Sequence, residues 1–164
     1  MPQTYTPIAT TTTSGSASSV TFSAITGTYT DLIIIVNGGT STSADLHIQF
    51  NGDTGANYSR TVLTGTGSVA NSGRQTSVNY YRVDQSGFLS TSFPNFNAVI
   101  NLMNYSNATT YKTPISRSNN AATGVDTSVG LWRNTAAITS ITLFPDVGTL
   151  TNGSTFTLYG IKAA

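Results

Sequence analysis

The sequence predicts an all-β protein: an antiparallel, jelly-roll-like β-sandwich of about 8–10 short strands with an extended N-terminal arm. Threonine, a good strand former, occurs 30 times in 164 residues, and glutamate, a common residue of helix surfaces, is absent. Apolar and polar residues alternate in several short segments, which is the period of a strand with one buried face. No segment keeps the 3.6-residue period of an amphipathic helix.

The chain is predicted to contain an arm and one domain. Residues 1–19 form the arm, because the segment TTTTSGSASS at 10–19 has low complexity and no apolar period. Residues 20–164 form a single sandwich domain, since a chain of this length holds one hydrophobic core. Strands are expected near residues 18–25, 30–37, 45–51, 57–64, 76–84, 95–104, 111–117, 125–133, 138–144 and 154–161.

Alternation also predicts which side chains enter the core. Leu46, Ile48 and Phe50 point to one face of their strand, and His47 points to the other. The run from Leu32 to Val36 is apolar on both faces, so we expect a central strand or one covered by a neighbouring chain. That run is the longest unbroken apolar segment and falls far short of the roughly 20 residues of a membrane-spanning helix.

Charge and cysteine content narrow the function classes. Charged residues make up 8% of the chain, the net charge is +1, and the basic residues are scattered singly. Nucleic-acid and membrane partners are therefore not expected, because both call for clustered basic or apolar residues. The chain has no cysteine, which excludes disulfides and thiolate metal sites. No catalytic, cofactor-binding or metal-binding residue is predicted, and no cofactor.

His47 is the only histidine, and a Ser-His-Asp triad would need it as the base. Its alternation with Leu46 and Ile48 favours an ordinary surface histidine, with a position at a trimer axis or interface as an alternative. Polysaccharide cleavage would need two carboxylates about 5–10 Å apart. The six acidic residues are far apart in sequence, so catalysis is disfavoured; they are Asp31, Asp45, Asp53, Asp84, Asp126 and Asp146. The Asn51–Gly55 segment is interpreted as a hairpin turn in preference to a calcium loop.

Several segments, in their order along the chain, resemble a family of tailed-bacteriophage virion proteins found in cyanophages and other aquatic phages. The segments are TYTPIATTT, SSVTFSAITGTYTDLIIIV, IQFNGDTGANYS, VGLW, AAITSITL and GSTFTLYGI. The resemblance runs from Tyr5 to Ile161 and weakens over residues 65–93. It implies a jelly-roll fold, commonly a homotrimer, used for capsid decoration or host attachment. The family landmarks present are Asn51, Gly52, Asp53, Gly55, Gly130 and Trp132, which are interpreted as structural.

Aromatic and apolar side chains outside the predicted core are candidates for partner contact. Tyr80, Tyr81 and Tyr111 are expected to lie on an exposed contact surface. The arm carries a small apolar anchor. Its residues are Tyr5, Pro7 and Ile8.

Together these observations predict a virion structural protein. The first hypothesis is a capsid decoration (cement) protein, a homotrimer that binds the major capsid protein on the outside of the head and stabilises it. The alternative is a tail-fibre or spike head domain, held by a tail protein, that binds a host surface receptor or glycan. A polysaccharide-degrading tail enzyme is a third class, disfavoured by the poor set of acids.

Overall fold

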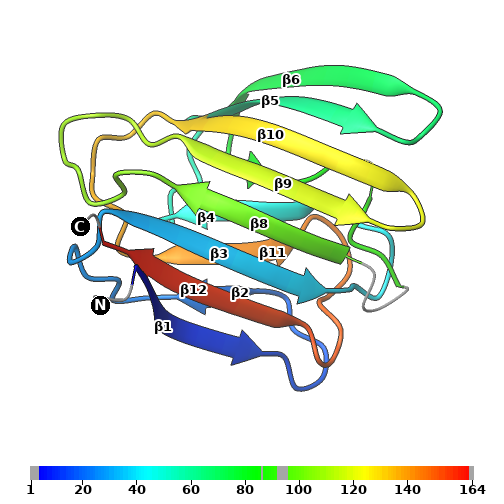
Figure 1. The fold of residues 1–164 in the computed structure, drawn as a ribbon, viewed down its shortest axis with the longest axis horizontal. Helices are drawn as coiled ribbons and strands as arrows, with labels where there is room; N and C mark the ends of the chain where they lie inside the picture. The colour runs from blue at the N-terminus through cyan, green and yellow to red at the C-terminus, as the bar shows by residue number, and fades with distance from the viewer. Residues whose placement is uncertain (1–3, 86, 92–95, 163–164) are drawn as a thin grey trace.

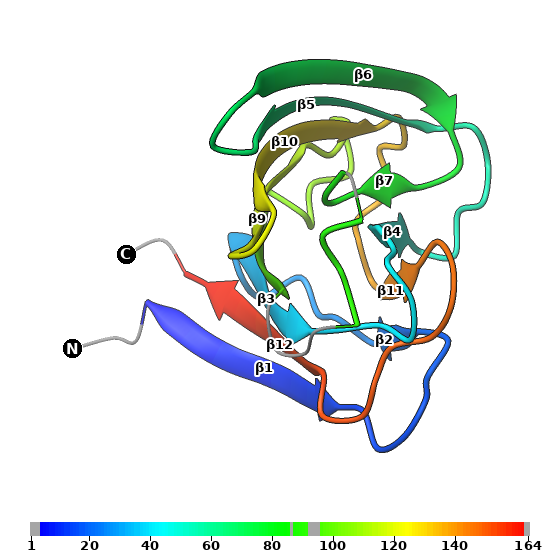
Figure 2. The same ribbon diagram turned by 90° about the vertical axis from the view of Figure 1, so that its right-hand side faces the viewer.

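The computed structural model describes residues 4–85, 87–91 and 96–162. These residues form twelve strands and no helix, and every strand pairing is antiparallel. The strands make two sheets that face each other, as seen from the side in Figure 2. The prediction of an all-β antiparallel sandwich is confirmed, with twelve strands in place of the expected 8–10; the finer jelly-roll description stays a prediction.

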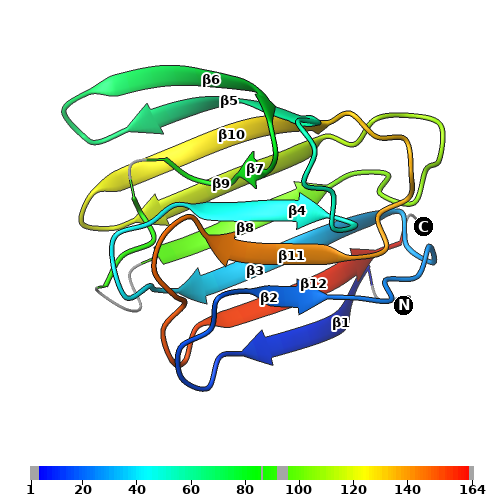
Figure 3. The ribbon, with the colours of Figure 1, turned by 180° about the vertical axis from the view of Figure 1, so that it is seen from behind.

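The larger sheet faces the viewer in Figure 1 and the smaller sheet faces the viewer in Figure 3. In spatial order, the larger sheet contains β1 (Tyr5–Thr12), β12 (Thr155–Ile161), β3 (Asp31–Gly38), β8 (Phe96–Leu102), β9 (Pro114–Asn120), β10 (Gly124–Trp132), β5 (Tyr58–Gly65) and β6 (Ala70–Val78). The smaller sheet contains β2 (Val20–Phe22), β11 (Ile141–Pro145), β4 (Leu46–Phe50) and β7 (Tyr81–Arg82).

The hydrophobic core lies between the two sheets and is built by the alternation seen in the sequence. In β3, Leu32, Ile34 and Val36 are fully buried, whereas Ile35 on the opposite face is 43% exposed. Strand β3 lies between β12 and β8, which confirms the prediction of a central strand. The apolar residues on its outward side therefore contribute to a surface of the molecule and not to the core.

Strand β1 corrects the prediction of an arm outside the sandwich. Residues 5–12 pair with β12 along its whole length, from Tyr5 opposite Ile161 to Thr12 opposite Thr155. The segment needs no apolar period because β12 supplies partners for its backbone groups, and threonine suits a strand. The register shifts between Pro7 and Ala9, an irregularity of the kind that bends an edge strand.

The inner surface of the larger sheet is polar toward β9 and β10. Ser116 and Ser128 are fully buried there. The Tyr81 hydroxyl of the smaller sheet lies 2.7 Å from Ser116 Oγ and donates to the Ser128 carbonyl (3.2 Å). Gly130 makes room for this ring, because a Cβ atom at position 130 would lie 2.3 Å from Tyr81 Cδ2. Small residues thus let an aromatic side chain cross from one sheet to the other.

The loop after β4 differs from the predicted hairpin turn. It crosses from the smaller sheet to the larger one, because β4 and β5 belong to different sheets. The Asp53 carboxylate organises the crossing by accepting hydrogen bonds from Gly55 N–H (2.8 Å), Asn57 Nδ2 (2.9 Å) and Trp132 Nε1 (2.7 Å). Trp132 itself is fully buried. This arrangement brings Asp53, Gly55 and Trp132 together at one structural junction.

Candidate functional site

We call the side of the larger sheet that faces away from the core the outer face, which is turned toward the viewer in Figure 1. Residues that pair directly in antiparallel strands share a face of the sheet. One such row crosses five strands and contains Ile35, Val99, Arg117, Thr127 and Leu63. The pairing therefore places apolar side chains from distant parts of the sequence side by side.

Large apolar side chains of the outer face are exposed. Leu63 is 61% exposed, Val125 57%, Val129 46% and Ile35 43%. The sheet backbone beneath them is hydrogen-bonded on both sides, so a partner would meet side chains in preference to unpaired backbone groups. An exposed apolar sheet surface of this kind is typical of a site where another protein packs.

Charge is sparse on the outer face. Among the described strand residues of the larger sheet, Asp31, Arg74 and Arg117 lie on the outward side. Two further charged residues, Arg60 and Asp126, are buried on the inward side. Cores of protein interfaces are depleted in charged residues, so the composition of this face suits an interface.

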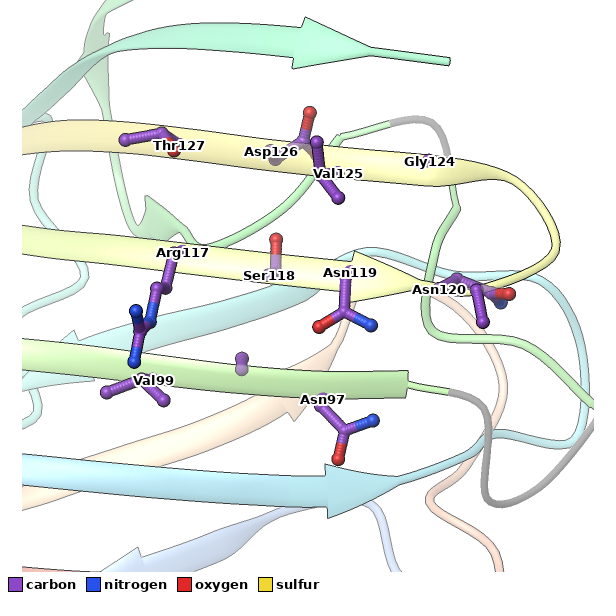
Figure 4. Close-up of a pocket in the computed structure, with 12 residues that line it drawn as sticks. Asn97, Val99, Arg117, Ser118, Asn119, Asn120, Gly124, Val125, Asp126 and Thr127 are labelled. Atoms are coloured by element: carbon purple, nitrogen blue, oxygen red, sulfur yellow. The ribbon is translucent and has the colours of Figure 1, made fainter. Parts of the chain in front are cut away.

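A shallow pocket of about 590 Å³ lies at one end of the outer face, across β8, β9 and β10 (Figure 4). Figure 4 shows Arg117 reaching from β9 toward Val99 on β8, with Asn97 and Asn119 nearby on the same two strands. Asn37 Nδ2 donates a hydrogen bond to Asn97 Oδ1 (2.8 Å). The lining offers amide and guanidinium groups that can form hydrogen bonds with a bound molecule, and apolar groups that can pack against it.

One carboxylate, that of Asp126, belongs to a residue of the pocket lining but is buried on the inner side of the sheet. Asp126 is 1% exposed and accepts hydrogen bonds from the Thr64 hydroxyl and from Gln85 N–H (2.5 Å). Burial raises the pKa of Asp126, and the hydrogen bond from Thr64 opposes that rise.

A second, more apolar groove of about 360 Å³ lies near the β1 edge of the outer face. It is lined by Tyr5, Ile33, Ile35, Val99, Arg117 and Tyr159. The predicted anchor residue Tyr5 is 56% exposed and contributes to this groove, and Pro7, paired with Tyr159, is also exposed. The third anchor residue, Ile8, is half-buried and packs against the core.

The three tyrosines predicted as a contact surface do not form one. Tyr111 is 53% exposed in the loop between β8 and β9. Tyr81 is only 1% exposed and belongs to the core, so its prediction as a contact residue was wrong. The reason is alternation: Tyr81 pairs with the buried Ile48, and its sequence neighbour Tyr80 turns to the opposite side and stacks on His47.

His47 corrects a second prediction. It points away from the core, as the alternation predicts, yet it is 4% exposed and not an ordinary surface histidine. The Tyr80 ring stacks on it with centroids 3.7 Å apart, and the Phe144 ring meets it edge-on at 5.5 Å. Asp45 and Asp146 offer carboxylate oxygens that lie, with a ring nitrogen of His47, within 4.8 Å of one another. No metal-binding residue was expected from the sequence, yet within the described part of the chain these three side chains form a group that could hold a metal.

The pH response of His47 gives a direct test of this burial. Burial lowers the pKa of His47 to about 4, with Asp146 opposing the change. The unfolded chain takes up this proton near pH 6.5, so the ring's contribution of about 3 kcal/mol to stability is lost as the pH falls from 6.5 toward 4. We expect the single imidazole, followed by NMR in the presence of a chelator, to titrate with a midpoint near pH 4. A midpoint near pH 6.5 would contradict the buried position.

Carboxylates that are far apart in sequence do gather, but inside the protein. Asp84 is fully buried, and its Oδ1 accepts a hydrogen bond from Leu46 N–H (2.6 Å). Burial raises its pKa well above the usual range, and the nearby charges of Asp45 and Asp126 raise it further. Its Oδ2 has no partner among the described residues. Acids that are far apart in the sequence thus approach one another in the fold, and Asp84 at the centre of the group is fully buried.

Comparison with protein-family models finds no match, and comparison with curated proteins finds none either. The described part of the chain contains no helix that is long and apolar enough to cross a membrane.

Proposed function

We propose that this chain is a structural protein of a bacteriophage virion that assembles through its outer face. In this proposal it is a capsid decoration protein: a homotrimer that binds the major capsid protein on the outside of the head. The observation that carries the proposal is the set of exposed apolar side chains on the outer face, Leu63, Val125, Val129 and Ile35. The resemblance of the ordered sequence segments to phage virion proteins supports the particle as the setting.

Burial of these side chains favours association. Removing apolar surface from water contributes roughly 25 cal/mol per Å². The sandwich also presents its apolar side chains on a hydrogen-bonded sheet, so little ordering is needed when a partner binds. Many modest contacts per subunit, multiplied by the copies on a particle, suffice for stable decoration.

One observation favours the alternative, a fibre or spike head that binds a host receptor or glycan. The loop between β8 and β9 exposes Met103 (45%) and Tyr111 (53%), and exposed loops are common sites of receptor contact. Substituting Tyr111 by serine would reduce adsorption of phage to host cells if this alternative holds, and would leave adsorption unchanged if the protein decorates the head.

A charge on the outer face is expected to disrupt assembly. Val125→Asp places a carboxylate in the proposed interface, where it would be buried without a partner, so we expect trimers to dissociate to monomers. Val147→Asp is the matched control, because Val147 is similarly exposed (51% against 57%) but lies beyond β11 of the smaller sheet. Size exclusion with light scattering measures both. A monomeric wild-type chain at high concentration would refute assembly through this face.

The location on the particle needs its own experiment. Purified protein added to expanded heads that lack it should sediment with them, and a cryo-EM map should show it on the outer surface. Heads so decorated should retain DNA at higher temperature than bare heads. Density on the tail and none on the head would move the protein to the alternative class.

A further inference from the structure

A second group of side chains lies on the opposite side of the sandwich from the outer face. His47 lies in β4, and Asp45 directly precedes that strand, separated from His47 by one residue. Asp146 follows β11, the strand next to β4, and its N–H donates to the Asp45 carbonyl (3.0 Å). One carboxylate oxygen from each aspartate and one ring nitrogen of His47 lie within 4.8 Å of one another.

The hydrogen bonds of the two carboxylates leave room for a cation. Asp45 Oδ1 accepts from Gly87 N–H (2.9 Å), and Asp45 Oδ2 accepts from Arg82. Asp146 Oδ1 accepts from Asp45 N–H (2.8 Å). An ionised carboxylate has about four lone-pair sites, so both groups retain unused acceptor capacity. The guanidinium of Arg82 pairs with Asp45, and Arg60 also acts on this carboxylate from a greater distance, whereas Asp146 is exposed and available to a cation.

His47 is the independent observation that points to a ligand. The residue is 4% exposed, and the described contacts of its ring are with the aromatic rings of Tyr80 and Phe144. The neutral imidazole nitrogen of histidine is the commonest metal ligand in proteins, so a ring nitrogen without a protein partner is suited to hold a metal ion. Stacking on Tyr80 and edge contact with Phe144 fix the ring, which holds its nitrogen beside the two carboxylates.

We propose that Asp45, His47 and Asp146 bind one divalent transition-metal ion of the zinc type, which ties the ends of β4 and β11 together. Imidazole combined with carboxylate oxygen suits Zn²⁺ and similar ions, whereas Mg²⁺ and Ca²⁺ prefer oxygen ligands alone. Zn²⁺ bonds of about 2.0–2.2 Å bring ligand atoms to roughly 3.3 Å from one another. In the structure the three ligand atoms lie up to 4.8 Å apart, so the exposed side chain of Asp146 would move toward the other two when the ion binds. Water molecules would complete the coordination.

The probe for this site is Zn²⁺ added to chelator-treated protein. Titration calorimetry should give one ion per chain, and thermal unfolding should shift upward by roughly 5–10 °C at 100 times the dissociation constant. Mg²⁺ and Ca²⁺ at the same concentrations should give a smaller shift. A chelator should reverse the effect of Zn²⁺. Absence of both heat and shift with Zn²⁺ would overturn the proposal.

A matched pair of variants separates this site from general binding to carboxylates. Asp146→Asn keeps the acceptor for Asp45 N–H and removes the charge, so the fold should persist while Zn²⁺ affinity falls at least about 10-fold. Asp31→Asn is the control, because Asp31 likewise accepts a backbone hydrogen bond, from Asn104 N–H (2.7 Å), and lies on the other sheet. Equal affinity in Asp146→Asn, or an equal loss in Asp31→Asn, would contradict the assignment. Neither result depends on how the chain assembles.

Discussion

Replacing Arg60 by methionine should lower the free energy of unfolding by about 3–5 kcal/mol, the cost of breaking a buried charge network. Arg60 is 4% exposed, and its guanidinium donates to Gln75 Oε1 (2.9 Å), the Asp84 carbonyl (2.9 Å) and Gln85 Oε1 (3.0 Å). Methionine would fill similar space but leave these acceptors unpaired. It would also remove a positive charge beside buried carboxylates, including Asp126.

Arg74→Met is the control for this substitution. Arg74 lies on β6, next to β5, and its side chain is on the exposed outer face. The same chemical change there should alter stability by less than about 0.5 kcal/mol. Urea unfolding can be followed through the fluorescence of Trp132, the only tryptophan. Equal unfolding midpoints for the two variants would show that the buried network contributes nothing.

Gly130→Ala is expected to have the second large effect, a loss of about 3 kcal/mol from overpacking. The added Cβ would lie 2.3 and 2.4 Å from two ring atoms of Tyr81 and 3.0 Å from Pro114 Cγ. The ring cannot move aside freely, since Tyr81 is 1% exposed and its hydroxyl is hydrogen-bonded to Ser116. Thermal unfolding should therefore occur about 6–12 °C lower than in the wild type.

Gly65→Ala provides the matched glycine control for that experiment. Gly65 lies in β5 and pairs with Val125 of β10, the strand that contains Gly130. A Cβ atom at position 65 would meet Val125 Cγ2 at an ordinary 3.7 Å. We expect little change in its unfolding temperature. A Gly130→Ala protein as stable as Gly65→Ala would mean that the Tyr81 ring has space to move.

Much of the fold was predictable because alternation is a local signal. The buried faces of β4, β8 and β12 follow directly from it, whereas β3 is apolar on both faces and its buried side is set by its place in the sheet. Strand β6 was predicted only at its end, because ANSGRQTSV has no apolar alternation and its pairing is supplied by β5. Strand β1 was missed for the same reason, since β12 supplies its hydrogen bonds.

The sites were less predictable because they depend on contacts between distant residues. Asp45 and His47 are neighbours in the sequence, but Asp146 joins them only through the pairing of β4 with β11. The burial of His47 depends on Tyr80 and Phe144, whose positions follow from the register of neighbouring strands. The sequence correctly predicted that the His47 side chain points away from the core, but its low exposure could be seen only in the tertiary structure.

The position of β12 between β1 and β3 has a consequence for biosynthesis. Both neighbours come from the first 38 residues, so they remain without this partner until residues 155–161 have left the ribosome. During that interval the apolar strand β3 has an open edge, which is the kind of feature that chaperones cover. Pairings of such high contact order also slow folding. Expression at reduced temperature, or with extra chaperone, should therefore raise the soluble yield.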